Sequence, residues 1–274
     1  APLRDEVQRQ TGLAAVPVIA SSSHDTASAV AGIPMEGPDQ LWLSSGTWSI
    51  MGMETPEPQL GPSAYQARCC NELGVNGMVR ALRNISGLWI IQECKRQWAL
   101  DGEDLGYAEL TELALEAPAL QSFIDPDDPV FASPGDMPEK IREFCRRHDQ
   151  PIPESKGAIL RTATESLALK YAVIFEEFTT MSGKSFDRLN VGGGGIQNHF
   201  LAQATASALG VDVIAGPIEA TSCGNIIVQM IATGEIGDLM EGRQIIRNSF
   251  EFQHYRPKDC EAWKAARTRF QSIL

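Results

Sequence analysis

Residues 186–216 read FDRLNVGGGGIQNHFLAQATASALGVDVIAG and hold two strand patterns around four glycines and a helix pattern. The strand patterns, 186–191 and 211–215, are rich in apolar and β-branched residues. The stretch 197–209 is rich in small apolar residues and stops at a glycine, as helices often do. A further helix is predicted over 222–233. This alternation of strands and helices predicts an α/β fold, in which helices cover the faces of a sheet.

Earlier in the chain, hairpins and longer helices are predicted. Residues 41–55 (LWLSSGTWSIMGMET) hold strand formers on both sides of Ser-Ser-Gly-Thr, which predicts two strands joined by a tight turn. A second hairpin is predicted over 65–82. Helices are predicted over 87–99 and 155–181, where apolar residues recur every three or four positions.

Two other segments have less regular patterns. The chain opens with a helix that ends at Gly12, and a strand is predicted over 16–20. The chain opens in the middle of an element, so we expect either part of a longer protein or a full domain with a ragged start. The Pro- and Asp-rich stretch 121–138 predicts a long loop, which we interpret as an ordinary surface loop, a lobe boundary or a lid.

The composition narrows the class of protein. The chain has 274 residues, of which 43% are apolar and 21% charged, so it can bury a core. Its 23 Lys and Arg against 35 Asp and Glu give a net charge of −12, which disfavours nucleic acids and anionic membranes as partners. No apolar run reaches the ~20 residues of a membrane span. The six cysteines form neither a disulfide nor a zinc pattern, so we expect a reducing, cytoplasmic location.

A carboxylate stands between the strand predicted over 16–20 and a helix of small residues. It belongs to Asp25 and follows His24. Asp25 can cap the helix, or it can accept a proton from a substrate hydroxyl at the carboxyl end of the strand. The two roles are compatible, because a helix N-terminus keeps a carboxylate ionised.

Two turns that contain glycine are candidate phosphate sites. Residues 44–47 form either a plain hairpin turn or a source of backbone N–H groups and one hydroxyl for a phosphate. Residues 192–195, all glycine, let a ligand approach the backbone, and the helix start after them favours anions. They form no P-loop, because no Gly-Lys-Ser/Thr follows. They form no dinucleotide fingerprint either, because Gln197 or Asn198 stands where the third glycine is needed.

The order of these motifs resembles the carbohydrate kinases of the glycerol kinase/xylulokinase (FGGY) type, within the actin–hexokinase superfamily, and above all their rhamnulokinase branch. The matching segments are residues 23–30, 43–49, 84–89, 92–93, 191–198, 215–220 and 224–225. The resemblance implies an actin-like ATPase (ribonuclease H-like) domain, an α/β fold with a mixed sheet flanked by helices. It also implies that residues 1–36 are the tail of an N-terminal, sugar-binding lobe and that 37–274 are a C-terminal, nucleotide-binding lobe.

For the chemistry, the resemblance implies an enzyme that transfers the γ-phosphoryl group of ATP, with Mg²⁺, to the 1-hydroxyl of L-rhamnulose. Asp25 would be the general base, and His24 would lie at the sugar. The residues expected at ATP are Gly46 and Thr47 at the β and γ phosphates, Asn84 and Gln92 on the nucleotide side, and Gly193, Gly194, Gly195 and Asn198 at the adenosine and α-phosphate. The resemblance assigns no metal ligand to this chain. The implied partners are the ketose, ATP and the N-terminal lobe, which holds the Mg²⁺-linked Asp.

Other functions stay open at this point. The acceptor can be another ketose or a polyol, such as L-fuculose, xylulose or glycerol. The chain can also be a non-catalytic nucleotide-binding module of the same superfamily, with Asp25 only a helix cap. A dinucleotide-dependent oxidoreductase is disfavoured by the broken glycine fingerprint. On its own, the chain is expected to bind nucleotide weakly and to show no turnover, because most of the N-terminal lobe is missing.

Overall fold

The computed structural model describes residues 1–22, 24–37 and 39–274. Its strands form one seven-stranded sheet in the order β3-β4-β2-β1-β5-β6-β7. The strands are β1 (Leu41–Ser45), β2 (Trp48–Thr55), β3 (Cys70–Leu73), β4 (Val79–Ser86), β5 (Arg188–Gly192), β6 (Asp212–Ala215) and β7 (Gln253–Tyr255). Strands β1, β5 and β6 are parallel, whereas β2, β3, β4 and β7 join the sheet through antiparallel pairs. The sheet is therefore mixed, unlike the parallel sheet of dinucleotide-binding folds.

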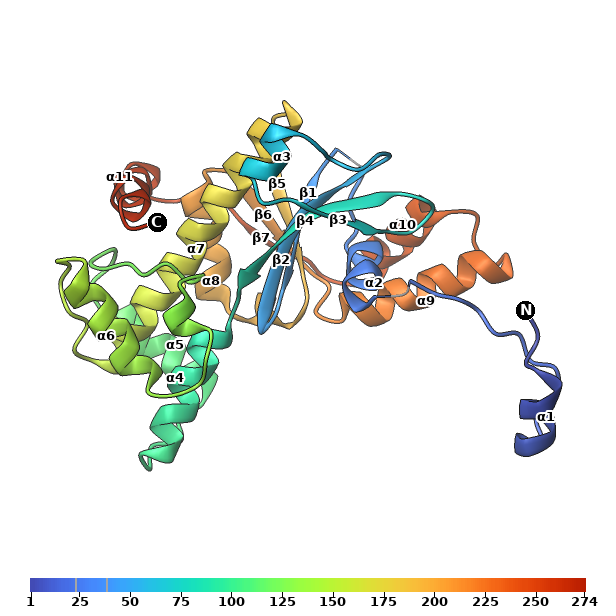
Figure 1. Ribbon diagram of the computed structural model, residues 1–274, viewed down its shortest axis with the longest axis horizontal. Helices are drawn as coiled ribbons and strands as arrows, with labels where there is room; N and C mark the ends of the chain where they lie inside the picture. The colour runs from blue at the N-terminus through green and yellow to red at the C-terminus, as the bar shows by residue number, and fades with distance from the viewer. Residues whose placement is uncertain (23, 38) are drawn as a thin grey trace.

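Helices cover both faces of this sheet (Figure 1). The α-helices of the described residues are α1 (Asp5–Thr11), which lies away from the sheet, α2 (Asp25–Gly32), α3 (Pro62–Gln66), α4 (Trp89–Leu100), α5 (Tyr107–Glu116), α6 (Met137–Arg147), α7 (Lys156–Ser182), α8 (His199–Leu209), α9 (Ala220–Thr233), α10 (Leu239–Ser249) and α11 (Cys260–Gln271). Helices α7, α8 and α11 pack on one face, and α2, α9 and α10 lie on the other. Helices α4, α5 and α6 form a separate cluster around the first half of α7.

Strand β1 shows how the sequence directs its side chains to the two faces. Leu41 and Leu43 are buried in the cluster that contains α7 and α8. Trp42, between them, is buried in the cluster that contains α2. Because successive side chains of a strand point to opposite faces, three consecutive buried apolar residues show that helices cover β1 on both sides. The α/β prediction is therefore confirmed.

Helix α7 is the longest helix and follows the predicted stripe. The Ser155 side chain accepts a hydrogen bond from the Ala158 N–H and so caps the start of the helix. Gly183 ends it in the left-handed conformation, with φ of 65°. Seventeen of its residues are buried, because the sheet covers its second half and the α4–α6 cluster covers its first.

The predicted hairpins are confirmed, but two other predictions need correction. The strand expected over 16–20 does not form, and this segment makes only an isolated bridge between Pro2 and Pro17. Its apolar residues had indicated a strand, but Pro17 has no N–H and Val16 and Val18 stay exposed. The stretch 121–138 is largely irregular as predicted, up to the start of α6 at Met137, but Phe123, Ile124 and Phe131 are buried, so it is no exposed surface loop.

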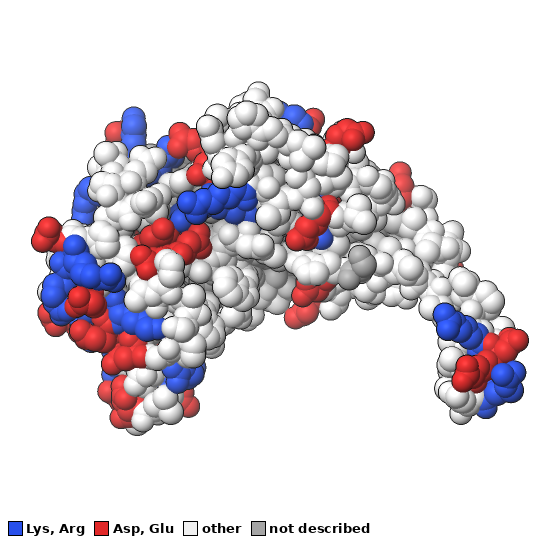
Figure 2. Space-filling view, in the orientation of Figure 1, with Lys and Arg blue, Asp and Glu red and all other residues white. Residues whose placement is uncertain are grey.

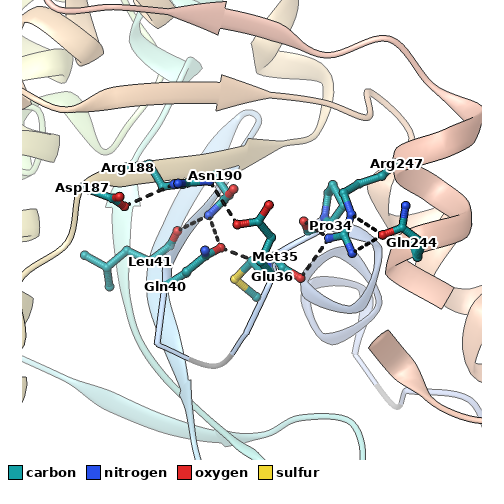
Figure 3. A network of polar contacts seen from close by, with 10 residues as sticks. All are labelled: Pro34, Met35, Glu36, Gln40, Leu41, Asp187, Arg188, Asn190, Gln244 and Arg247. Carbon is teal, nitrogen blue, oxygen red and sulfur yellow. Dashed lines mark hydrogen bonds and ion pairs between the residues drawn. The ribbon is translucent and has the colours of Figure 1, made fainter. Parts of the chain in front are cut away.

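The connection between α2 and β1 is tied to the elements on both sides of it (Figure 3). Arg188 of β5 donates to the Glu36 carboxylate at 3.2 Å. Arg247 of α10 donates to the Pro34 carbonyl at 2.9 Å. Asn190 of β5 donates to the Gln40 side chain at 3.1 Å. These contacts fix the end of α2 relative to the sheet.

Candidate functional site

Asp25 is the first residue of α2, and its carboxylate is open to solvent. The N-cap position belongs to His24, so the interpretation of Asp25 as the helix cap is wrong by one residue. The Asp25 Oδ1 accepts the Thr26 N–H at 2.6 Å and lies 3.3 Å from the His24 Nδ1. The Asp25 side chain is 78% exposed and that of His24 is 55% exposed. Both groups can therefore reach a ligand; Ser23, part of the same motif, lies outside the described residues.

Helix α2 is held against α9 by a contact between glycines. A Cβ added to Gly224 would lie 1.8 Å from the Ser28 carbonyl oxygen, and one added to Gly32 would lie 2.0 Å from the Ala220 oxygen. The two backbones therefore approach more closely than any side chain permits. Asn225 of α9 also donates to the Ser21 hydroxyl at 3.0 Å. These contacts explain the Gly-Asn pair of the sequence motif, because they fix the helix that carries Asp25.

The turn between β1 and β2 consists of Gly46 and Thr47, as predicted. Its carbonyl groups point to the start of α4, where the Leu88 N–H donates to Gly46 at 3.0 Å and the Trp89 N–H donates to Thr47 at 3.1 Å. Gly87 permits this approach, because a Cβ there would lie 2.6 Å from the Gly46 oxygen. Gly46 is half-buried, and its N–H donates to the Trp48 carbonyl at 3.1 Å. Thr47 is exposed, so the turn can offer the Thr47 hydroxyl to a ligand.

The glycine loop, residues 192–195, lies against the base of this hairpin. A Cβ added to Gly195 would lie 2.1 Å from the Ser45 Oγ, and one added to Gly193 would lie 2.7 Å from the Ser45 carbonyl oxygen. Gly193 also has a φ of 94°, which favours glycine. Gly194 faces open space, with nothing within 4 Å of an added Cβ. Two glycines thus serve the contact with Ser45, and the backbone of the third is accessible.

The fold brings the two predicted phosphate segments together, although about 150 residues separate them in the chain. They meet because β1 and β5 are parallel neighbours, with Leu43 beside Val191 and Ser44 beside Gly192. Both strands therefore end at the same edge of the sheet. Figure 1 shows this edge between α4 and α2, and Figure 2 shows the molecule hollowed there. Ligands of α/β proteins bind in such places, beyond the carboxyl ends of parallel strands.

Three other predicted site residues have clear positions. Asn198 caps α8, since its Oδ1 accepts the Leu201 N–H at 2.9 Å. Asn84 is exposed on β4, opposite Ile50 of the hairpin. Gln92 is half-buried in the first turns of α4. Within the described ranges, no hydrogen bond joins Asn84 or Gln92 to the glycine loop. The positions of these two side chains are therefore set by β4 and α4, which lie beside the hairpin.

Tyr171 is a buried residue beside the hairpin that the sequence pattern did not single out. It lies on α7 with no exposed surface, and its hydroxyl is 2.6 Å from the Ser49 Oγ at the start of β2. Burial raises the pKa of Tyr171 above its ordinary value, and hydrogen bonds with Ser49 and Ser45 oppose that rise. The hydroxyl therefore stays protonated. Its position in the apolar stripe of α7 had indicated a core residue, and no signal in the stripe marks the hydroxyl as different.

The surface around the site is not strongly charged. Figure 2 shows Lys, Arg, Asp and Glu mixed over the α4–α6 cluster and over the N-terminal segment, with few of them in the middle of this face. Among residues 1–22, 24–37 and 39–274, no group of three or more His, Cys, Asp or Glu is suited to a metal ion. No helix in the same ranges is both long and apolar enough to cross a membrane.

Comparison with known proteins identifies the family. Residues 41–233 match the model of the FGGY family of carbohydrate kinases, C-terminal domain. The chain belongs to the FGGY family of carbohydrate kinases. The matched FGGY domain contains β1 to β6, the turn at Gly46 and Thr47, and the glycine loop. The resemblance predicted from the motifs is therefore confirmed.

Curated FGGY relatives agree with this assignment. The chain is 43% identical over 272 residues to a rhamnulokinase of Bacteroides thetaiotaomicron, and the match covers 99% of the chain and 55% of that protein. It is 40% identical over 259 residues to a rhamnulokinase of Enterococcus faecalis, covering 94% of the chain and 51% of that protein. The chain thus spans about half the length of the curated relatives that it matches.

Solved FGGY structures confirm the fold. A gluconate kinase of Lactobacillus acidophilus has a TM-score of 0.72 at 16% identity, covering 100% of this chain and 54% of that one. A xylulose kinase of Rhodospirillum rubrum has a TM-score of 0.71 at 16% identity, covering 99% of this chain and 54% of that one. A Plasmodium falciparum glycerol kinase solved with ADP has a TM-score of 0.63 at 14% identity, covering 91% of this chain and 49% of that one. The predicted actin-like ATPase fold, with its mixed sheet flanked by helices, is correct.

Proposed function

We propose that this chain is the C-terminal, nucleotide-binding portion of an ATP-dependent sugar kinase that phosphorylates the 1-hydroxyl of L-rhamnulose. One observation carries the proposal: the close contact of Gly193 and Gly195 with Ser45 joins the two candidate phosphate segments at one sheet edge. Helix α2 presents Asp25 on the adjacent face of the sheet. The names of the relatives, rhamnulokinases at 40 to 43% identity, support the choice of sugar.

In this proposal, the hairpin and the glycine loop hold ATP. Gly46 and Thr47 contact the β and γ phosphates, and Asn84 and Gln92 lie on the nucleotide side. The residues at the adenosine and α-phosphate are Gly193, Gly194, Gly195 and Asn198. Backbone N–H groups bind anions without a net positive charge, which explains how a chain of net charge −12 can bind ATP. Mg²⁺ enters as part of Mg·ATP, because this ion is usually held by substrate phosphates and only one or two carboxylates.

The chemical step then requires one base and good alignment. The Asp25 carboxylate accepts the proton of the ketose 1-hydroxyl while that oxygen bonds to the γ-phosphorus. The bond between the γ-phosphorus and the bridging oxygen of ADP breaks, and the products are a ketose 1-phosphate and ADP. His24, beside Asp25 and half exposed, orients the sugar. Phosphoryl transfer depends mainly on positioning and electrostatic stabilisation, which fits a site built from backbone and a single exposed carboxylate.

The rest of the site would come from an N-terminal lobe. We propose that residues 1–36 are the end of that lobe and that 37–274 form the nucleotide-binding lobe, with α2 of the first packed on α9 of the second. Helix α1 buries no residue, and Leu13, Val16 and Val18 are 42 to 54% exposed. Figure 1 shows this segment extending away from the sheet. Apolar side chains exposed in this way support packing against another part of the parent protein.

Two alternatives remain, and one experiment separates a kinase for any acceptor from a binding module. The acceptor can be another ketose or a polyol, or the chain can be a nucleotide-binding module without catalysis. Asp25→Asn in the full-length parent keeps the shape of the site and removes the base. A kinase loses kcat by about 10² to 10⁴-fold and keeps its affinity for ADP. A parent protein that binds ATP but turns over no sugar supports the binding module and contradicts the kinase.

A further inference from the structure

We propose that Tyr171 is a positioning residue that holds the β1–β2 hairpin in place for ATP. The inference rests on the proposed function, because it assigns Gly46 and Thr47 to the phosphates. Tyr171 itself would touch no substrate. It would act through Ser49 and Ser45, which flank the turn.

The hydroxyl of Tyr171 lies at the closing pair of the hairpin. Ser45 is the last residue of β1, Ser49 is the second of β2, and the two are register partners. Ser49 has no exposed surface and Ser45 is 3% exposed. The Tyr171 hydroxyl lies 2.6 Å from the Ser49 Oγ. A buried hydrogen bond at the closing pair restricts where the three residues that it encloses, 46–48, can lie.

The same closing pair supports the glycine loop. The Ser45 side chain fills the space where Gly195 would carry a Cβ. Ser45, Tyr171 and Gly195 line one small cavity between β1 and α8. A shift of the hairpin base therefore changes the spacing between the two segments proposed to hold ATP.

Lys170, the residue before Tyr171, is linked through Asp127 to the end of β4. The buried Lys170 ammonium lies 2.8 Å from the Asp125 carboxylate and 3.1 Å from that of Asp127. Asp127 in turn accepts the Ser86 N–H at 2.9 Å, at the end of β4. Two consecutive residues of α7 thus fix β2 and β4 at the same edge of the sheet. This arrangement points to α7 as the rigid support of the hairpin.

Removing the Tyr171 hydroxyl should lower kcat/KM for ATP and leave the KM for the sugar nearly unchanged. Tyr171→Phe keeps the ring in the core and leaves the Ser49 hydroxyl without its partner. A misplacement of about 1 Å in a catalytic site can lower the rate about 10²-fold. We expect kcat/KM for ATP to fall by about 10 to 100-fold. The KM for the sugar should stay close to the wild-type value, because Asp25 begins α2 and His24 precedes it, away from the hairpin.

The test uses the full-length parent kinase and a control on the same helix. Ser166→Ala also removes a buried hydroxyl from α7, one that donates to the Thr162 carbonyl at 2.6 Å and accepts the Ile124 N–H at 2.9 Å. Neither of these hydrogen bonds involves the hairpin or the glycine loop. Kinetics with ATP and sugar varied in turn, ADP affinity and thermal unfolding are measured for both variants. Both should unfold at a lower temperature, but only Tyr171→Phe should lose kcat/KM for ATP.

Other outcomes overturn the proposal. Wild-type kinetics for ATP in Tyr171→Phe, or an equal loss in Ser166→Ala, show that Tyr171 has a structural role only. If Tyr171→Phe does not fold, Ser49→Ala removes the same hydrogen bond from the hairpin side, and it must then show the selective loss for ATP. A wild-type parent that binds no ATP would contradict the proposed function itself. The failure of that function is therefore distinguishable from the failure of the role proposed for Tyr171.

Discussion

The Oγ of Ser45 lies 2.1 Å from the point that a Cβ on Gly195 would occupy. No pair of side chains tolerates that separation, so a glycine is needed at 195 for a reason internal to the protein. Gly194 has no such neighbour. A Cβ on Gly192 would lie 2.8 Å from the Ile33 side chain. The run of four glycines therefore combines two requirements, which are close packing at three positions and an accessible backbone at Gly194.

Substitution of these two glycines should separate stability from nucleotide affinity. Gly195→Ala forces the loop away from Ser45, and overpacking of this kind costs about 1–3 kcal/mol. Gly194→Ala adds a methyl group where the structure has open space, so the free energy of unfolding should change by less than about 0.5 kcal/mol. The same methyl group should weaken the binding of ATP, which is proposed to lie there. Urea unfolding and ADP titration of both variants measure the two effects. Equal nucleotide affinity of Gly194→Ala and the wild type would contradict the placement of ATP.

The contact between Ser45 and Gly195 also shows what the sequence can and cannot predict. Hairpin turns, glycine stops and apolar periodicity are local patterns, and they predicted β1, β2, α7 and the segments around the glycine loop. The pairing of β1 with β5 depends on the whole sheet, so the approach of Ser45 to Gly195 is invisible in the chain. The error at residues 16–20 has the same origin, because a strand needs a partner edge as well as a pattern.

The site residues divide in the same way. Asp25, Gly46 and the glycine loop belong to short motifs and could be predicted. Tyr171 could not, because its hydroxyl differs from the rest of its helix stripe only through the position of Ser49. The roles of all these residues stay predictions until they are tested.

The packing of α2 on α9 should depend on Gly224. Gly224→Ala places a methyl group 1.8 Å from the Ser28 carbonyl oxygen and forces α2 and α9 apart. We expect a loss of about 1–3 kcal/mol in the free energy of unfolding. A fall in kcat should accompany it, because Asp25 moves with α2. Gly106→Ala is the control, since nothing lies within 4 Å of a Cβ there and its φ is −73°. Equal unfolding of the two variants would show that the helices adapt without strain.

A buried ion pair should stabilise the face of the sheet that α2 covers. Arg243 of α10 and Glu54 of β2 lie 2.8 Å apart, and their side chains are 2% and 4% exposed. Glu54→Gln leaves the guanidinium buried without its counterion, which costs about 3–5 kcal/mol. The matched control is Glu143→Gln on α6, which breaks a half-exposed pair with Arg146. That control should cost less than about 1 kcal/mol. Urea unfolding of both variants measures the loss in the free energy of unfolding, and equal losses would contradict the prediction.

The 274-residue chain without further sequence should bind nucleotide and fail to phosphorylate sugar. In the proposal, most of the sugar site and the Mg²⁺-linked Asp come from the N-terminal lobe. Calorimetric titration with ADP should therefore detect weak binding, while ADP release with any sugar should match the blank. Robust turnover by the chain alone would place the whole site within these residues.

The most direct test of the account is the release of ADP by the full-length parent protein, with Mg·ATP and a panel of ketoses and polyols. We predict activity with L-rhamnulose that falls by about 10² to 10⁴-fold in Asp25→Asn. Activity with a different sugar would keep the base and the mechanism and would correct the acceptor. Measurable ATP binding without activity on any sugar, or an Asp25→Asn variant as active as the wild type, would contradict the proposed kinase mechanism.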